Sequence, residues 1–253
     1  MTDSKSAESI RREVREYYAS RSPAEASAED CGCATPSAAA SCCQPKGSAA
    51  DLPGDIAEFS LGCADPVAAA ALQPGETVLD LGSGGGLDCI VAARQVGQTG
   101  RVIGVDMTEE MLSRARGNSE RLGLTNVEFR KGLIEEMPVE QGSVDVLISN
   151  CVVNLSPDKP AVFREITRVL RPGGRLSIGD IVTLGEMPAD LRTMKDSWAA
   201  CVAGALTADE YVEGLHQAGL AEIALTPADG RSLAEIPAGL PFSAIIRARK
   251  PPD

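Results

Sequence analysis

A glycine-rich segment that follows an apolar strand constrains the fold of this 253-residue chain more than any other feature. Residues 77–81 read TVLDL, residues 82–86 read GSGGG, and a helical apolar pattern covers residues 87–96. Glycine allows the sharp turn between strand and helix, and it lets a ligand approach the backbone without a Cβ in the way. The order of strand, glycine loop and helix therefore predicts the first unit of a nucleotide-binding α/β fold.

Strand and helix patterns alternate along the rest of the chain. Short apolar runs indicate strands, and apolar positions at helical spacing indicate helices. The predicted strands are residues 77–81, 101–106, 127–130, 144–150, 175–182, 221–225 and 242–247. The predicted helices are residues 9–18, 87–96, 109–122, 160–170, 189–206 and 207–218. Strands separated by helices form right-handed βαβ units. We therefore expect an α/β, Rossmann-like fold with a mostly parallel, seven-stranded sheet flanked by helices.

Composition divides the chain into three parts. Residues 1–55 begin with the predicted helix and continue into a stretch rich in Ala, Ser, Pro and Gly with almost no bulky apolar side chain. Such a stretch cannot bury enough apolar surface to offset the entropy of ordering, so we expect residues 20–54 to be mobile. Residues 56–183 form the predicted nucleotide-binding core. Residues 184–253 form a small C-terminal region that completes the sheet on the substrate side.

The charge balance argues against two classes of partner. The chain has 24 Lys and Arg residues against 36 Asp and Glu residues, which gives a net charge of −12. Binding to nucleic acid or to an anionic membrane requires clustered basic side chains, so we expect neither partner. Apolar runs stay below the about 18 residues that span a bilayer, and the N-terminus lacks an apolar signal-peptide core. We therefore expect a cytoplasmic protein.

The glycine-rich loop differs in its spacing from a dinucleotide-binding loop. A GxGxxG pattern that begins at Gly82 requires glycine where the chain has Leu87, and the loop reads GxGxG instead. Asp106 ends the next strand, where its carboxylate can accept both hydroxyl groups of a ribose. A second carboxylate before the loop, that of Asp80, repels a pyrophosphate and suits a cationic ligand such as the amino-acid end of S-adenosylmethionine. The loop therefore favours methyl transfer over hydride transfer.

Three segments, DLGSGGGLD, GVDM and VLRPGG, resemble those of the class I S-adenosylmethionine-dependent methyltransferases over roughly residues 56–182. The resemblance implies a Rossmann-like methyltransferase fold with the cofactor bound at the loop. It implies that Met107 and residues 133–135 hold the adenine. The residues expected at the cofactor site are Asp80, Gly82, Ser83, Gly84, Gly86, Asp106, Met107, Leu133, Ile134 and Glu135.

Eight cysteines require an explanation in such a chain. They are Cys31, Cys33, Cys42, Cys43, Cys63, Cys89, Cys151 and Cys201. In a protein without an export signal, cysteines more often bind metals, act in catalysis or fill a core than form structural disulfides. The sequence has no CxxC pair, which argues against a zinc ribbon and a thioredoxin-like site. We expect Cys89, in the helix after the loop, to be a small buried hydrophobic residue.

Three of the cysteines lie outside the N-terminal segment in positions that suit a substrate site. Cys63 precedes the first core strand, and Cys201 lies on the predicted helix at 189–206. Cys151 follows Asn150 at the carboxyl end of a strand, where ligands bind in open α/β sheets. Thiolates select soft, thiophilic centres. Three convergent thiolates without a histidine suit trivalent arsenic, whose lone pair can attack a sulfonium methyl group without a general base.

Longer segments around these cysteines resemble those of the arsenite methyltransferases. They are LGCADP, DLGSGGGLDC, SNCVVNLSPDK, WAACVAGAL and the closing FSAIIRARK, within a resemblance that covers most of residues 56–250. The resemblance implies that Cys63, Cys151 and Cys201 bind As(III). It also implies that Asn150 lines the cofactor site together with Asp106, Met107 and Ile134.

The same resemblance implies an arsenite methyltransferase that acts in arsenic detoxification with S-adenosylmethionine as cofactor. Arsenite or methylarsenite is expected to arrive as a thiol conjugate and to exchange onto the protein thiols. A further cysteine, Cys42 or Cys43, is expected to take part in a disulfide relay that glutathione or thioredoxin recharges. Cys31 and Cys33 form a second thiol pair, which we interpret as a metal-scavenging or redox-incidental part of the N-terminal segment. A structural zinc site of all four N-terminal cysteines is an alternative, although the CxC…CC spacing does not match the usual pattern.

Two other functions stay open from the sequence. One is a methyltransferase for a small organic acceptor such as a quinone, although an aromatic content of 3% makes an aromatic-lined acceptor pocket hard to build. The other is a non-catalytic thiol protein that binds metalloids, against which the intact loop and Asp106 argue. Trp198 shares a predicted helix face with Cys201, so we expect arsenite binding to quench its fluorescence.

Overall fold

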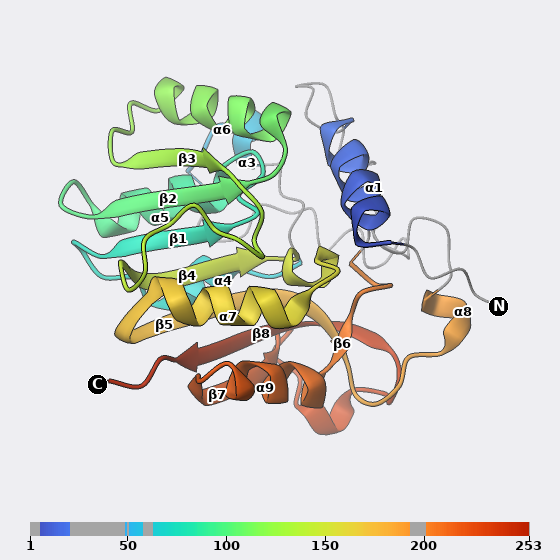
Figure 1. The fold of residues 1–253 in the computed structure, drawn as a ribbon. Helices are drawn as coiled ribbons and strands as arrows, with labels where there is room; N and C mark the ends of the chain where they lie inside the picture. Colours follow the sequence, from blue (N-terminus) through green and yellow to red (C-terminus); the bar gives the residue numbers. More distant parts are fainter. Residues whose placement is uncertain (1–5, 21–48, 50, 58–62, 193–200, 253) are drawn as a thin grey trace.

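The computed structural model describes residues 6–20, 49, 51–57, 63–192 and 201–252 (Figure 1). Within these residues, eight strands form one sheet in the order β3-β2-β1-β4-β5-β8-β7, and β6 pairs with β5 off this path. The strands are β1 (Thr77–Leu81), β2 (Arg101–Asp106), β3 (Val127–Lys131), β4 (Val144–Asn150), β5 (Leu170–Thr183), β6 (Leu206–Thr207), β7 (Ala221–Pro227) and β8 (Pro241–Arg249). The pairings among β1 to β6 are parallel, and β8 pairs antiparallel with β5 and β7. The expected α/β class with a mostly parallel sheet is confirmed.

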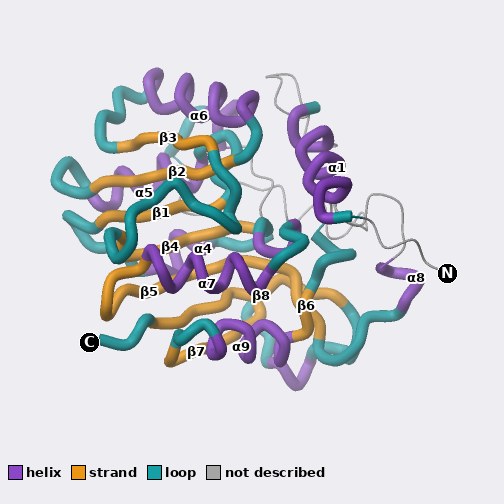
Figure 2. The backbone as a smooth tube through the Cα atoms, viewed as in Figure 1, coloured by secondary structure: helices purple, strands orange, loops and turns teal. Residues whose placement is uncertain are grey.

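Helices cover both faces of the sheet (Figure 2). The described helices are α1 (Ala7–Ala19), α3 (Gly54–Ala57), α4 (Pro66–Ala70), α5 (Leu87–Val96), α6 (Glu109–Arg121), α7 (Lys159–Val169), α8 (Ala189–Arg192) and α9 (Ala208–Gln217), with short 3₁₀ turns η3 (Val153–Leu155) and η4 (Leu233–Glu235). On one face, Phe163 of α7 and Tyr211 of α9 pack together in one core cluster. On the other face, Val67 of α4 and Ile90 of α5 belong to a second cluster. The core therefore lies in two layers, one on each side of the sheet.

Local signals explain where two of the helices begin. At the start of α7, Asp158 accepts a hydrogen bond from the backbone N–H of Ala161 at 3.0 Å, and proline occupies the first turn. At the start of α9, the hydroxyl of Thr207 accepts the N–H of Glu210 at 3.1 Å, and the carboxylate of Glu210 accepts the N–H of Thr207 at 2.8 Å. Thr207 is therefore both the last residue of β6 and the N-cap of α9, and this capping box fixes where the helix begins.

The C-terminal region differs from the expectation at one point. The seven predicted strands form the continuous path of the sheet, and the two-residue β6 is an addition. The predicted helix at 189–206 is wrong at its C-terminal end, because Cys201 occupies a turn with a φ of 61°. The described helix α8 ends at Arg192, and residues 193–200 lie outside the described part. Residues 206 and 207 pair with the end of β5. The extended backbone that caps α9 and joins the sheet is incompatible with a continued helix.

The N-terminal helix α1 confirms the helix expected at residues 9–18. It lies beyond the carboxyl ends of the parallel strands and not on either face of the sheet (Figure 1). Most of the segment 20–54, which we expect to be mobile, lies outside the described residues. Near the end of that segment, Ala49 and Leu52 are buried in the same core cluster as Ile90. Among the described helices, none is long and apolar enough to cross a membrane.

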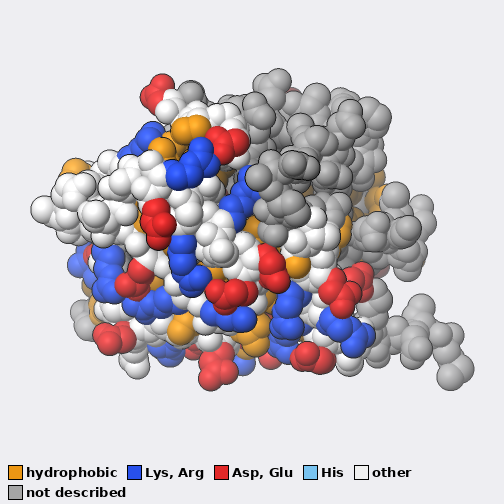
Figure 3. All heavy atoms as spheres, turned by 90° about the horizontal axis from the view of Figure 1, so that it is seen from above, with side chains coloured by type: hydrophobic (Ala, Val, Ile, Leu, Met, Phe, Trp, Pro, Cys, Tyr) orange, Lys and Arg blue, Asp and Glu red, His pale blue; other side chains and the backbone are white. Residues whose placement is uncertain are grey.

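Charged side chains of both signs share the surface of the described residues. Figure 3 shows Lys and Arg side chains interspersed with Asp and Glu on the face seen from above. Exposed ion pairs join neighbouring elements, such as Arg101 with Glu128 and Arg121 with Asp55, each at 2.7 Å. Such exposed pairs contribute up to about 1 kcal/mol each, so the sheet and its two core layers dominate the stability.

Candidate active site

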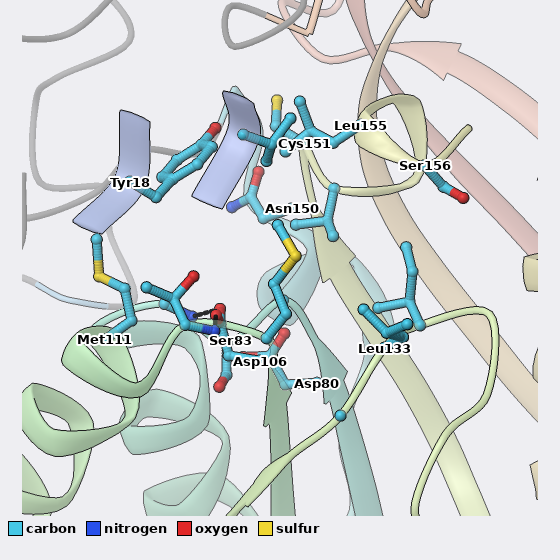
Figure 4. Close-up of a pocket in the computed structure, with 18 of the residues that line it drawn as sticks. Tyr18, Asp80, Ser83, Asp106, Met111, Leu133, Asn150, Cys151, Leu155 and Ser156 are labelled. Carbon is cyan, nitrogen blue, oxygen red and sulfur yellow. Dashed lines mark hydrogen bonds between the residues drawn. The ribbon is translucent and has the colours of Figure 1, made fainter. Parts of the chain in front are cut away.

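A pocket lies at the carboxyl ends of β1, β2 and β4, between the glycine-rich loop and α1 (Figure 4). This is where open α/β sheets bind ligands. The predicted cofactor residues that line it are Asp80, Gly82, Ser83, Gly84, Asp106, Met107, Leu133, Ile134, Glu135 and Asn150. Cys151 lines it as well. The tertiary structure therefore brings together four segments that the sequence could only predict one by one.

The glycine-rich loop needs its glycines for different reasons. Gly82 has a φ of 65°, and a Cβ there would collide with the side chain of Val152. Gly84 has a φ of 48° with open space around it, and it lines the pocket. Gly86 is not among the pocket-lining residues; it has a φ of 85° and begins α5, where a Cβ would lie 3.0 Å from the side chain of Ala115. Gly86 thus serves helix packing in this structure.

Three carboxylates gather around the loop. Burial raises the pKa of Asp80 well above its ordinary value, and the nearby charge of Asp88 adds to the rise. Burial also raises the pKa of Asp106, although the N–H groups of Thr108 and Gly84, at 2.8 and 2.9 Å from its oxygens, oppose the rise. Bringing like charges together out of water is unfavourable, and a cation between them removes that cost. The loop is therefore suited to a positively charged ligand.

The buried Cys89 stabilises one of these carboxylates. Its side chain is fully buried, as expected, and its Sγ donates a hydrogen bond to Oδ2 of Asp80 at 3.2 Å. Burial raises the pKa of Cys89 well above its ordinary value, so the group remains a protonated donor. The thiol therefore holds Asp80 in place from behind the loop.

The opposite wall of the pocket is apolar with one charged group at its rim. Met107 and Ile134 present apolar side chains, and both pack against buried core residues. The carboxylate of Glu135 accepts hydrogen bonds from Arg11 of α1 at 3.1 Å and from the hydroxyl of Ser156 at 2.8 Å. An apolar slot beside a polar edge suits an aromatic base with exocyclic nitrogen atoms.

Asn150 connects the pocket with the predicted substrate cysteines. Its Oδ1 accepts the backbone N–H groups of Cys63 at 3.0 Å and of Ala64 at 3.3 Å. Its Nδ2 donates to the carbonyl of Ala64 at 2.9 Å and to the carboxylate of Asp88 at 3.0 Å. One side chain at the end of β4 therefore fixes the segment that carries Cys63 relative to the cofactor loop.

The three predicted substrate cysteines lie together beside the pocket. Cys63 and Cys151 form a disulfide bond, and the sulfur of Cys201 donates a hydrogen bond to the carbonyl of Cys151 at 2.9 Å. The sulfurs of Cys151 and Cys201 and a carboxylate oxygen of Asp180 all lie within 4.8 Å of one another. We call Cys63, Cys151 and Cys201 the thiol cluster. The expected partner of the relay, Cys42 or Cys43, lies outside the described residues, as do Cys31 and Cys33.

Both buried cysteines of the thiol cluster have strained backbones. Cys151 and Cys201 have φ values of 59° and 61°, in the left-handed region that residues other than glycine seldom adopt. Such strain persists only where the surrounding packing and hydrogen bonds hold the backbone in that conformation, and strained residues cluster at functional sites. Trp198, for which we expect quenching by arsenite, lies outside the described residues.

Several residues of the site were missed by the sequence analysis. Arg11, Val14 and Tyr18 of α1 line the pocket, as does Asp88 at the start of α5. Asp180 is fully buried in β5, and burial raises its pKa to about 7 against the opposing N–H groups of Ile181 and Asn154. A carboxylate within the mostly apolar run LSIGDIV was an available signal for Asp180. A local pattern could not reveal that α1 folds back over the loop.

Comparison with known proteins defines the class first. The family model described as a methyltransferase domain matches residues 72–219, which places the chain among the class I S-adenosylmethionine-dependent methyltransferases. An arsenite methyltransferase of Halobacterium salinarum is 49% identical over 208 residues, which cover 78% of this chain and 52% of that protein. An arsenite methyltransferase of Aquipseudomonas alcaligenes is 45% identical over 157 residues, which cover 59% of this chain and 45% of that protein.

A solved structure supports the same relationship. It is that of an arsenic(III) S-adenosylmethionine methyltransferase from Chlamydomonas reinhardtii, with a TM-score of 0.65 and 34% identity over 81% of this chain and 72% of the other. The protein belongs to the arsenite methyltransferase family. The chain spans about half the length of the curated relatives that it matches, so the activity of those longer proteins is carried to it as a proposal.

Proposed function

We propose that the protein is an enzyme that transfers methyl groups from S-adenosylmethionine to trivalent arsenic bound by Cys63, Cys151 and Cys201, in arsenic detoxification. The observation that carries the proposal is the position of Cys151, whose side chain lines the pocket while its sulfur belongs to the thiol cluster. A donor and a bound acceptor in adjoining sites react without diffusing, so proximity and alignment supply the rate gain. The names of the relatives support the same acceptor.

The pocket residues fit S-adenosylmethionine on two grounds. The carboxylates of Asp80, Asp88 and Asp106 favour a cation, and the apolar surface of Met107 suits an adenine ring. When bound, the cofactor supplies a methyl group on a positively charged sulfur. In this proposal Asp106 accepts the ribose hydroxyls. Met107 and residues 133–135 hold the adenine.

The thiol cluster binds the substrate in this proposal. Arsenite or methylarsenite arrives as a conjugate with glutathione or another small thiol. Each exchange forms a bond between arsenic and a cysteine sulfur, breaks the bond to a small thiol, and passes the cysteine proton to the departing thiol. The bound arsenic keeps a lone pair. That pair forms the new bond to the methyl carbon, and the electrons of the broken carbon–sulfur bond remain on the donor sulfur. Because this nucleophile carries no proton, the reaction needs no general base.

The Cys63–Cys151 disulfide supports a requirement for a thiol reductant. Both sulfurs must be thiols before they bind As(III), and reduction of the disulfide takes two electrons and two protons. Methyl transfer formally oxidises the arsenic from the trivalent to the pentavalent state. Two protein thiols that become a disulfide return two electrons, and we propose Cys42 or Cys43 as one of them. Glutathione or thioredoxin then restores the thiols.

The division into parts and the place of action complete the proposal. We assign residues 1–55 to the N-terminal helix and the relay cysteines, 56–183 to the methyltransferase core, and 184–253 to an arsenic-binding region. We propose the cytoplasm as the place of action, with small thiols and thioredoxin as partners and without a nucleic-acid or membrane partner. The net charge of −12 and the interspersed charges of Figure 3 support the last point.

The decisive experiment measures methyl transfer from S-adenosylmethionine to arsenite with excess glutathione, with arsenic species separated by chromatography and detected as the element. We expect methylated arsenic from the wild type and from a control that replaces Cys31 and Cys33 by serine. We expect no product from Cys151→Ser or Cys201→Ser, although both still bind S-adenosylhomocysteine. Absence of product with arsenite bound would favour metalloid sequestration, and absence of both would favour an organic acceptor.

A further inference from the structure

The N-terminal helix α1 packs on the active site and not on the sheet. Its buried side chains Ile10 and Val14 belong to the same apolar cluster as Cys151, Leu155 and Cys201. Val14 is 1% exposed, as deeply buried as residues of the main core. A helix of 13 residues is marginal in water without a partner for its apolar side. The surface that stabilises α1 therefore includes the thiol cluster and the pocket beside it, together with α6 and η3.

An ion pair fixes α1 across the mouth of the pocket. Nη2 of Arg11 lies 3.1 Å from Oε1 of Glu135, and the same oxygen accepts the hydroxyl of Ser156 at 2.8 Å. The two charged side chains are 22% and 10% exposed. At this burial the pair is less screened than a surface pair and resists sliding of the helix. This contact therefore fixes the position of the N-terminal half of α1 relative to the pocket.

Tyr18, at the other end of the helix, reaches both halves of the site. Its side chain lines the pocket and packs against the buried apolar cluster that contains Cys151 and Cys201. Figure 4 shows its ring extending from α1 toward Asn150, with the hydroxyl on the side of the pocket where Cys151 lies. The hydroxyl and the thiol of Cys201 are hydrogen-bond partners. Tyr18 thus contacts the thiol of Cys201 while it forms a wall of the pocket.

We propose that Tyr18 is a positioning residue of the arsenic site, which orients the thiol of Cys201 toward the other two sulfurs and, carried by α1, excludes water from them. This inference rests on the proposed function. The thiol of Cys201 already has one partner, the carbonyl of Cys151. A second partner from α1 restricts its rotation about the side-chain bond. A thiol held in one direction loses less entropy when it binds arsenic.

The electrostatics of Cys201 agree with this role. Burial raises the pKa of Cys201 well above its ordinary value, and the charge of Asp180 raises it further. The hydrogen bond from Tyr18 acts in the opposite direction, since it stabilises the ionised sulfur. Burial also raises the pKa of Tyr18, so its hydroxyl remains a donor. Loss of the hydroxyl therefore removes a favourable partner of the sulfur.

The test compares Tyr18→Phe with Tyr17→Phe. Both variants lose a hydroxyl from the same helix and keep the ring, and the two rings pack edge to face at 5.2 Å. Tyr17 is not among the residues that line the pocket. For each reduced variant we would measure the dissociation constants of arsenite and of S-adenosylhomocysteine. Tyr18→Phe should weaken arsenite binding about three- to tenfold, the loss of one hydrogen bond. It should weaken S-adenosylhomocysteine binding less, because phenylalanine keeps the ring that lines the pocket. Tyr17→Phe should change neither.

A double variant links the effect to Cys201. In a Cys201→Ser background, Tyr18→Phe should have a smaller effect on the remaining arsenite affinity than in the wild type. An equal effect of Tyr18→Phe in both backgrounds would overturn the proposal. Equal arsenite affinity of Tyr18→Phe and Tyr17→Phe would also overturn it. So would a Tyr18→Phe variant that binds arsenite and S-adenosylhomocysteine more weakly by the same factor. Wild-type protein that binds no arsenite would instead refute the proposed function. The two failures are therefore distinguishable.

Discussion

Replacing Asn150 by alanine tests whether this side chain couples the substrate thiols to the cofactor pocket. Its four hydrogen bonds join Cys63, Ala64 and Asp88 at distances between 2.9 and 3.3 Å. With about 1 kcal/mol for each of the three neutral bonds and about 2 kcal/mol for the bond to the carboxylate, the side chain contributes at most about 5 kcal/mol. Water replaces part of this at a part-buried site, so we expect the free energy of unfolding to fall by about 2–4 kcal/mol.

The assay pairs urea unfolding with ligand binding. Asn150→Ala releases both the segment of Cys63 and the carboxylate at the start of α5, so the dissociation constants of arsenite and S-adenosylhomocysteine should each rise about tenfold, or about 1.4 kcal/mol. Asn126→Ala is the matched control, because Nδ2 of Asn126 also donates two hydrogen bonds, to Ala93 at 3.1 Å and Gly97 at 2.9 Å. Asn126 precedes β3, at the opposite end of the sheet. The coupling argument fails if both variants lose stability and both bind the two ligands like the wild type.

Three further predictions follow from the same structure. Gly86→Ala should lower the free energy of unfolding by about 2–4 kcal/mol, because a positive φ and a close contact combine there. Gly84→Ala, which has a positive φ but open space, should lower it by only about 1–2 kcal/mol and should weaken S-adenosylhomocysteine binding more than Gly86→Ala does. Equal losses of stability in the two variants would contradict this. Arg11→Ala removes the ion pair with Glu135 that fixes α1, so it should weaken S-adenosylhomocysteine binding about three- to tenfold in titration calorimetry. Arg12 is exposed on the same helix, and the control Arg12→Ala should leave the dissociation constant unchanged. The pKa of Asp180 is raised from 3.8 to about 7, so the folded state keeps a proton that the unfolded state loses, and its contribution to stability falls as the pH rises between these values. The stability of Asp180→Asn relative to wild type should therefore rise by up to about 4 kcal/mol from about pH 4 to about pH 8 in urea unfolding, and a flat difference would refute the assignment.

The fold was predictable because its signals are local. The strand, the glycine loop and the helix that follows it lie within residues 77–96, and the periodicity of each segment survives in the structure. The error at residues 189–206 has an equally local cause. An apolar run with helical spacing cannot indicate that residues 206 and 207 will find a partner in β5, because that partner lies over twenty residues earlier in the chain.

The lining of the pocket was predicted more completely than the surroundings of the thiol cluster. Asp80 and Asp106 lie at strand ends that the pattern identifies, whereas Asp88, in the first turn of α5, was missed. The assignment of Cys63, Cys151 and Cys201 came from a resemblance, and the structure adds that two of them form a disulfide. Their convergence depends on a turn at Cys201 that the helical pattern of the sequence did not predict.

The sequence by itself determined the succession of strands and helices along the chain, the glycine-rich turn after the first core strand, and the acidic residues beside that turn. These properties follow from the spacing of glycine, apolar and acidic residues over about twenty positions. Only the tertiary structure decided that α1 closes the pocket, since Arg11 and Glu135 are 124 residues apart, and that Asn150 holds Cys63 across 87 residues. Contacts at such separations depend on how packed elements meet in space, and no periodicity in the chain encodes them.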